Sequence, residues 1–253
     1  MSRNLSYSAL ALRVRPSGES NREAWFLSAE EGLVKAMLFG GPKSRLRALV
    51  APFHEGRLML YHDPVRDSRK VSDFDVMSYR TGLRELYERA MCAGAIAETI
   101  LSSQGGGGNW QEAAVLTGSV LDSLNEADAA ACSRISVYFF WHWARILGLG
   151  LELSVCGSCS HKPMPAETLW FSARKEALLC ENCLQNERSL ITQGSSFCLD
   201  PGARLWLKEI ESLPPAALAE VSLNTASLEQ AKALSKALLT AALGKRLPSW
   251  DGI

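Results

Sequence analysis

Residues Tyr7-Ser-Ala-Leu-Ala-Leu-Arg-Val-Arg15 lead directly into Pro16-Ser-Gly18, and this stretch begins a series of short strands. Apolar and polar residues partly alternate along it, as in a strand with one buried face, and the proline–glycine sequence predicts a turn. Together with the runs that follow before residue 80, it predicts five short strands in a small antiparallel barrel or sandwich. The other four runs are Ala24–Leu27, Leu33–Phe39, Gly56–Tyr61 and Lys70–Tyr79.

Beyond these strands, the apolar residues recur at steps of three and four, which predicts helices. One apolar stripe runs over Leu83–Leu101, and the run Gly105–Gly108 links it to a second helix over Trp110–Leu124. A third helix, Ala129–Leu147, is apolar nearly all round. Such a helix is typical of the buried centre of a bundle.

Two closing helices are expected, one from Pro201 and one ending at Leu243, with Ser227 and Gln230 as its capping box. The fold class is therefore α+β multidomain: an OB-type (oligonucleotide/oligosaccharide-binding) barrel, then a helical bundle with an inserted cysteine knuckle. The expected domains are residues 1–79 (barrel), 80–152 (helical), 153–187 (four-cysteine zinc finger) and 188–253 (helices that complete the helical domain).

Two Cys-x2-Cys pairs carry the strongest chemical signal. Cys156-Gly-Ser-Cys159 and Cys180-Glu-Asn-Cys183 are separated by 20 residues, a spacing typical of a four-cysteine zinc site. Each pair fits on a tight turn, so that four thiolates can surround one ion at about 2.3 Å. With four protein ligands there is no open position for water, so one structural zinc ion is predicted.

Other interpretations of the cysteines stay open. The two pairs can be unrelated buried residues, His161 can replace one ligand, and iron can replace zinc in a rubredoxin-like site. The remaining cysteines, Cys92, Cys132 and Cys198, lie in apolar surroundings and are expected to be small buried hydrophobes.

The composition excludes a disordered or fibrous chain, since 47% of the residues are hydrophobic and 21% are charged. The formal net charge is zero, but residues 1–70 contain 12 Lys/Arg and 7 Asp/Glu, whereas residues 71–253 contain 15 and 20. A basic front half indicates that this part meets an anion. No apolar run approaches the roughly 18 residues of a membrane-spanning helix, and no signal peptide is recognised. Cysteines in close pairs are typical of metal ligands in the reducing cytosol. We expect a cytoplasmic protein.

The sequence offers no recognised catalytic arrangement. Gly105–Gly108 is followed by Asn109-Trp110 and not by Gly-Lys-Ser/Thr, so a phosphate-binding loop is excluded and a flexible linker is expected. Asp73 and Asp75 share one face of a strand and can bind a metal, although a solvated face is the preferred interpretation. We therefore expect a protein that is not an enzyme.

Basic residues cluster around the first loop and the third strand. On a small barrel, such cations can follow a phosphate backbone while aromatic side chains stack on bases, and Phe39 and Phe53 are the candidate aromatics. An ordinary mixed-charge surface is the alternative. The candidate DNA-binding residues are Arg13, Arg15, Arg22, Lys35, Lys43, Arg45 and Arg47.

Four further stretches are informative: Ala11-Leu-Arg-Val-Arg-Pro-Ser-Gly-Glu-Ser20 with Asn21-Arg22, Glu31-Gly-Leu-Val-Lys-Ala-Met-Leu-Phe-Gly40 with Pro42-Lys-Ser-Arg45, Ile146-Leu-Gly-Leu-Gly-Leu-Glu-Leu153 before Cys156, and Leu243-Gly-Lys-Arg-Leu-Pro-Ser249. In these stretches and in the order of its parts, the chain resembles the bacterial recombination mediator family RecO. The similarity spans nearly the whole chain, but Phe39 and Pro42 occupy places where the family often has cations.

The resemblance implies a DNA repair and recombination factor, nucleoid-associated, that binds single- and double-stranded DNA and anneals complementary strands. It also implies contacts with RecR and with the C-terminal tail of the single-strand-binding protein (SSB), so that recombinase is loaded onto SSB-coated DNA. Two alternatives remain, a zinc-containing protein–protein adaptor that does not bind DNA and an uncharacterised enzyme.

Overall fold

The structure, a computed structural model, describes residues 3–41, 43–188 and 196–253. Pro42 and part of the stretch expected to continue the helical domain, residues 189–195, lie outside the described residues. The contacts within the chain define two compact units, residues 1–132 with 247–253, and residues 133–246. The boundary falls inside one helix, α4 (Ala129–Ile146).

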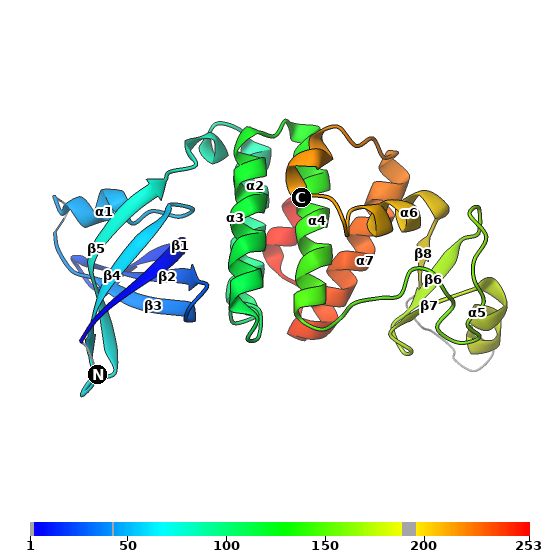
Figure 1. Cartoon of the computed structure of the whole chain (residues 1–253), viewed down its shortest axis with the longest axis horizontal. Helices are drawn as coiled ribbons and strands as arrows, with labels where there is room; N and C mark the ends of the chain where they lie inside the picture. The colour runs from blue at the N-terminus through cyan, green and yellow to red at the C-terminus, as the bar shows by residue number, and fades with distance from the viewer. Residues whose placement is uncertain (1–2, 42, 189–195) are drawn as a thin grey trace. The chain divides into compact units, whose positions relative to one another are not determined.

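The five strands expected from the sequence are present and form a closed barrel in the order β1-β2-β3-β5-β4 (Figure 1). One pair differs from the antiparallel expectation, because β3 and β5 run parallel where the barrel closes, with Met37 opposite Lys70. A bulge between Ala11 and Arg13 bends the long β1, so that its first half pairs with β4 and its second half with β2. The strands are β1 (Asn4–Ser17), β2 (Asn21–Ser28), β3 (Gly32–Leu38), β4 (Glu55–Asp63) and β5 (Ser68–Ser78).

The barrel core is built from the inward residues of every strand. Phe26 and Phe74 meet edge to face, with ring centroids 5.7 Å apart. Small residues of β1 and β2, including Ala11 and Ala24, leave room for these rings. The sequence did not predict the short helix α1 (Arg45–Leu49), which lies between β3 and β4.

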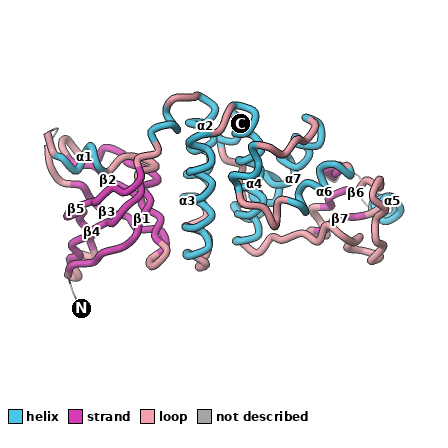
Figure 2. Tube along the Cα trace, turned by 45° about the horizontal axis from the view of Figure 1, so that its top comes forward, coloured by secondary structure: helices cyan, strands magenta, loops and turns pink. Residues whose placement is uncertain are grey.

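The helices of the first unit follow the barrel. The 3-10 helix η1 (Thr81–Arg84) precedes α2 (Tyr87–Ser102), so the helix expected from Leu83 starts with a tighter turn. Figure 2 shows α2 and α3 (Trp110–Glu126) side by side. The chain end returns to α2 through η3 (Pro248–Gly252), where the Trp250 indole donates to Thr99 Oγ1 at 3.1 Å.

The glycine run between α2 and α3 is a turn in which all four residues have positive φ. Gly105 and Gly106 are buried, and a Cβ at Gly105 would lie 3.3 Å from the backbone nitrogen of Leu33. The run joins two helices, as expected, but it packs against the barrel strand β3 and does not have the character of a free linker.

A buried arginine joins the barrel to α3. Arg80 is 5% exposed, and its Nε donates to Asp122 Oδ1 at 2.7 Å, while its Nη1 donates to the Phe53 carbonyl at 3.1 Å. Its Nη2 also pairs with Glu55 on β4. These contacts connect three segments that are distant in the sequence.

The second unit contains the rest of α4 and a three-stranded sheet, β7-β6-β8. The capping box expected at Ser227 and Gln230 is wrong: Asn224 caps α7 by accepting from Ser227 N at 2.9 Å, and Gln230 Oε1 accepts from Asp200 N. The elements are β6 (Leu169–Ser172), β7 (Ala177–Leu179), α5 (Glu181–Arg188), β8 (Ser196–Leu199), α6 (Pro201–Glu209), η2 (Pro215–Ala219) and α7 (Thr225–Leu243).

Among the described residues, no helix has both the length and the apolar character needed to cross a membrane. The 18-residue helix α4 instead buries consecutive aromatic residues, with Phe139 stacked on Trp143 at a centroid separation of 5.2 Å.

Candidate metal centre and nucleic-acid interface

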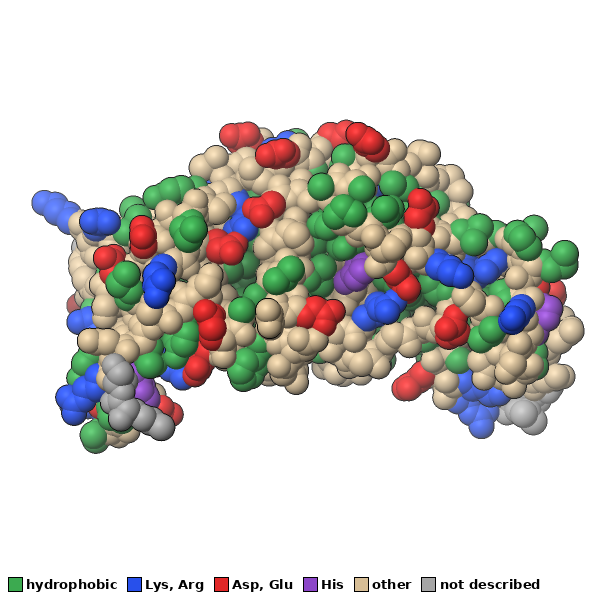
Figure 3. Space-filling model, in the orientation of Figure 1, with side chains coloured by type: hydrophobic (Ala, Val, Ile, Leu, Met, Phe, Trp, Pro, Cys, Tyr) green, Lys and Arg blue, Asp and Glu red, His purple; other side chains and the backbone are tan. Residues whose placement is uncertain are grey.

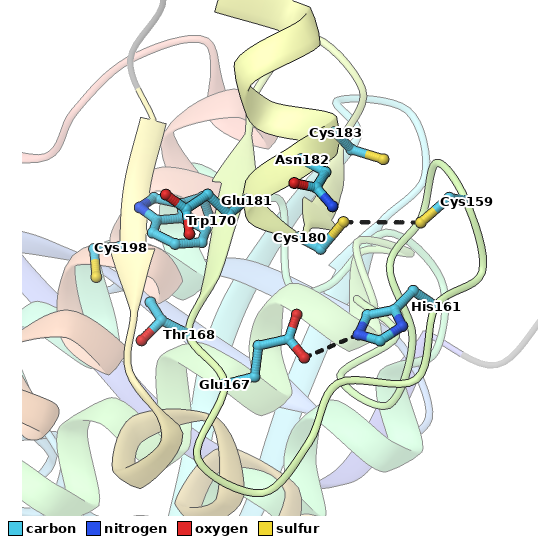
Figure 4. Close-up of a pocket in the computed structure, with 10 residues that line it drawn as sticks. All are labelled: Cys159, His161, Glu167, Thr168, Trp170, Cys180, Glu181, Asn182, Cys183 and Cys198. Carbon is cyan, nitrogen blue, oxygen red and sulfur yellow. Dashed lines mark hydrogen bonds and ion pairs between the residues drawn. The ribbon is translucent and has the colours of Figure 1, made fainter.

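The four cysteines of the two Cys-x2-Cys pairs meet in space. Their Sγ atoms all lie within 4.8 Å of one another, and Cys159 and Cys180 are 3.8 Å apart (Figure 4). The first pair lies in the loop before β6, whereas Cys180 directly follows β7 and Cys183 lies in the first turn of α5. This group could hold a metal ion, and four sulfur donors at these separations fit a thiophilic divalent ion.

Backbone hydrogen bonds shape the first turn of the knuckle. The Ser160 N–H donates to the Cys156 carbonyl at 2.9 Å, and the Gly157 N–H donates to the Leu178 carbonyl at 2.8 Å. A Cβ at Gly157 would lie 2.5 Å from the Cβ of Ala177, so only glycine allows the turn to approach the hairpin this closely.

The backbone also stabilises negative charge on one sulfur. Burial raises the pKa of Cys156, but N–H groups of Cys180, Cys159 and Ser158 point at its sulfur, and the net effect lowers this pKa to about 6. The Cys180 N–H lies 3.4 Å from that sulfur. At Cys183, burial and then hydrogen bonding with the neighbouring cysteine side chains, Cys159 first, raise the pKa to about 12. A bound cation would instead favour the thiolate form of each cysteine that it contacts.

His161 does not belong to the sulfur group. Its Nε2 lies 2.9 Å from Glu167 Oε2, and this pair lines the hollow beside the cysteines together with Trp170 (Figure 4). Arg204 of α6, 6% exposed, donates to the Met164 carbonyl at 3.0 Å and so holds the loop that carries this pair. The sequence pattern did not single out Arg204.

The remaining three cysteines differ from one another. Cys92 and Cys132 are buried, as expected, with the Cys92 thiol 3.7 Å from the Cys132 carbonyl. Cys198 is exposed, so its expected burial is wrong. It lies on β8, an edge strand of a small sheet, and Figure 4 shows it on the other side of Trp170 from Cys180.

The structure places the seven basic candidates on the barrel. Arg13 and Arg15 are exposed on β1, Lys35 is exposed on β3, and Arg22 is half-buried on β2. The other three follow β3: Lys43 and Arg45 are exposed, while Arg47 is half-buried on α1 and donates to the Ser20 carbonyl at 2.7 Å.

Two of these cations share one acidic partner. Glu23 on β2 is 7% exposed, accepts from Arg15 Nε at 2.8 Å, and also pairs with Lys35. Bonding to Lys35 lowers the pKa of Glu23 against the effect of its burial, and Arg15 lowers it further. Trp25 lies beneath both cations, with Arg15 Cζ 4.6 Å and Lys35 Nζ 5.6 Å from the ring centroid.

The two candidate aromatics have different surroundings. Phe39 is 46% exposed, and Lys70 Nζ lies 5.6 Å from its ring centroid. Phe53 is half-buried in a turn with φ of 72°, where its carbonyl accepts from Arg80. Trp25, Glu23 and Lys70 were missed as site residues, although Trp25 stands only three residues after the basic candidate Arg22 in the sequence.

On the face of the barrel that Figure 3 shows, basic and acidic side chains lie interspersed.

Residues 1–80 match the family model "Recombination protein O N terminal", and residues 84–251 match "Recombination protein O C terminal". The chain belongs to the recombination protein O (RecO) family. It is also 26% identical to the DNA repair protein RecO of Gloeobacter violaceus (strain ATCC 29082 / PCC 7421) over 220 residues, which covers 86% of this chain and 78% of that protein. The RecO resemblance and the OB-type barrel expected from the sequence are confirmed.

Proposed function

We propose that this RecO-family chain binds DNA through its barrel and anneals complementary single strands during recombinational repair. One observation carries the proposal: the family match covers both parts of a chain whose barrel presents cations and aromatic rings on adjoining strands. An OB-type barrel binds single strands by combining a basic track with stacking of bases on aromatic side chains.

Annealing follows because the ionic contacts with phosphate and the stacking contacts with bases are both weak. Cations such as Lys43 and Arg45 reduce the repulsion between two polyanionic strands, so complementary strands can approach on the protein. Bases held only by stacking remain free to pair. Duplex formation then releases the protein contacts, because stacking within DNA is of order 1.4 kcal/mol per base-pair step. Since most of the attraction comes from counterion release, binding should weaken steeply with salt.

The four-cysteine knuckle is proposed to hold one structural zinc ion through Cys156, Cys159, Cys180 and Cys183. Zinc would neutralise the clustered thiolates and tie the first turn to the β7–α5 segment. The sulfur group and the N–H groups directed at Cys156 support this assignment. No catalytic step is assigned to the ion, and we propose that the protein acts without enzymatic chemistry.

Family membership supports the remaining assignments. RecR and the C-terminal tail of SSB are proposed partners, through which the chain would help to load recombinase onto SSB-coated DNA. The proposed location is the cytoplasm, associated with the nucleoid. The domain boundaries at residues 79, 152 and 187 likewise remain a proposal.

Fluorescence anisotropy of a labelled single strand, titrated with protein at several salt concentrations, tests the proposal. We expect binding whose logarithmic affinity falls linearly with the logarithm of salt concentration. Absence of binding at low salt, by protein with a cooperative thermal unfolding transition, would favour the protein–protein adaptor instead.

A further inference from the structure

Arg15 is held in place on two sides. Its Nε and Nη2 lie 2.8 Å and 2.7 Å from Glu23 Oε2, and its Cζ lies 4.6 Å from the centroid of the Trp25 ring. Despite these contacts, 58% of the side-chain surface remains exposed. The guanidinium is therefore fixed over an indole while part of it still faces solvent.

The partner that fixes Arg15 also offsets its charge. Glu23 is a buried carboxylate that pairs with both Arg15 and Lys35, so these three side chains together contribute a single net positive charge. The Glu23 carboxylate weakens the attraction that these two cations would otherwise have for phosphate. The arrangement is better suited to orienting a planar group than to supplying charge.

The strand register places this cluster within a row of side chains that crosses the barrel. Side chains directly opposite on neighbouring strands share a face, and one such line contains Arg13, Trp25 and Lys35. A second line contains Arg15, Glu23, Met37 and Lys70. The second line ends near Phe39, whose ring lies beside the Lys70 ammonium.

The row therefore offers a second stacking position, the Arg15 guanidinium, besides the exposed ring of Phe39. A strand that crosses β1, β2, β3 and β5 would meet the Arg15 guanidinium over Trp25 first and the Phe39 ring with Lys70 last. Both are planar or aromatic groups accompanied by a cation, which is the combination that binds unpaired bases.

We infer that Arg15, held over Trp25 by Glu23, is a platform on which an unpaired nucleobase stacks, and that it gives the barrel a preference for single-stranded over double-stranded DNA. A base in a duplex has both faces covered by its neighbours, so it cannot use this platform. This inference rests on the proposed DNA binding and specifies which residue distinguishes the two forms of DNA.

The charge-conserving variant Arg15→Lys tests the inference, because lysine keeps the cation but has no planar group. Arg57→Lys is the control: Arg57 is exposed on β4, opposite Asp75 and outside the row, and it bonds Ser6 Oγ at 2.9 Å. Affinities are measured for a single strand, for the corresponding duplex, and for a single strand of equal length made of abasic sites. Thermal unfolding verifies that each variant is folded.

We expect Arg15→Lys to weaken binding of the base-containing single strand by roughly 5- to 150-fold, the range that loss of one stacked base gives. Affinity for the duplex and the abasic strand should change less than twofold, and the salt slope should stay the same because charge is conserved. The Arg57→Lys control should behave like the parent protein towards all three.

Two results would overturn the inference while leaving DNA binding intact. One is an Arg15→Lys variant that binds all three oligonucleotides as the parent does. The other is an equal loss for base-containing and abasic strands, which would make Arg15 a phosphate contact. If the parent protein bound none of the three, the proposed function itself would fail.

Discussion

The Sγ atoms of Cys159 and Cys180 lie 3.8 Å apart, although 20 residues separate them in the sequence. Four sulfurs about 2.3 Å from a central ion at tetrahedral corners would be about 3.8 Å from one another. The separation of these two sulfurs therefore matches one edge of the coordination tetrahedron that zinc prefers.

The first prediction concerns the metal. Protein purified without a metal-binding tag should contain about one zinc ion per chain by elemental analysis, as four thiolates complete a structural site. Cys159→Ser should lower this content markedly and reduce the thermal unfolding temperature, because metal binding contributes to folding. Cys198→Ser, which changes an exposed cysteine outside the group, is the matched control. Equal zinc content in the two variants would contradict the four-cysteine assignment.

A second prediction concerns Arg80, the buried link between the barrel and α3. Arg80→Met should lower the free energy of unfolding by about 1–3 kcal/mol, because the Phe53 carbonyl loses its donor and Asp122 loses its partner. Urea denaturation measures the change. Arg66→Met, a replacement at an exposed turn, should have little effect. If both variants unfolded at the same urea concentration, Arg80 would not stabilise this junction.

A third prediction concerns pH. His54 is 4% exposed, with Nδ1 2.8 Å from the Leu49 carbonyl, Nε2 3.4 Å from Arg84 Nη2, and the Tyr79 ring against its own. Burial lowers the pKa of His54; the Leu49 carbonyl opposes this effect and the Arg84 cation adds to it.

Because the pKa of folded His54 is below that of the unfolded chain, protons bind preferentially to the unfolded state. The stabilisation from neutral His54 is complete above about pH 6.5 and is lost as the pH falls from there through the folded pKa. His54→Asn keeps a donor for Leu49 but does not titrate, so its unfolding temperature should fall less between pH 7.5 and 5.5. If the unfolding temperature of this variant depended on pH as steeply as that of the parent protein, His54 would not be the cause of the pH dependence.

A fourth prediction addresses the charge on the loop after β3. The double variant Lys43→Ala with Arg45→Ala should lower single-strand affinity and flatten the salt slope by about 1.4 units, since each cation contributes about 0.7 on single strands. Lys162→Ala with Arg174→Ala, two exposed cations of the knuckle region, makes the same charge change elsewhere. Equal slopes for the two double variants would mean that this loop is not the DNA contact.

Local sequence signals predicted much of the fold. The five strands follow from alternation and turns, and α2, α3 and α4 follow from apolar residues three and four apart. Short elements were missed, because the five residues of α1 and the three of β7 hold too few apolar positions to show a period. The start of α7 was misjudged because Asn224 and Ser227 are both good capping residues, and the partner of Gln230 is Asp200, 30 residues away.

The cysteine group was predictable because the spacing within each Cys-x2-Cys pair is local. The pairing of the basic surface residues with a buried carboxylate was not predictable. Arg15 and Lys35 are cations in the sequence, but their partner Glu23 is 8 and 12 residues away. Only the register of β1, β2 and β3 brings the three together, with both cations over Trp25. Burial of this carboxylate depends on the folded barrel, so composition alone overstates the free positive charge.

Annealing of two labelled complementary oligonucleotides, with and without the protein at low and high salt, is the decisive test of the proposed DNA annealing. We expect faster annealing at low salt and an acceleration that fades as salt rises, since counterion release supplies the attraction. No acceleration at low salt, by folded protein that carries its metal, would contradict DNA annealing and leave the protein–protein adaptor as the better description.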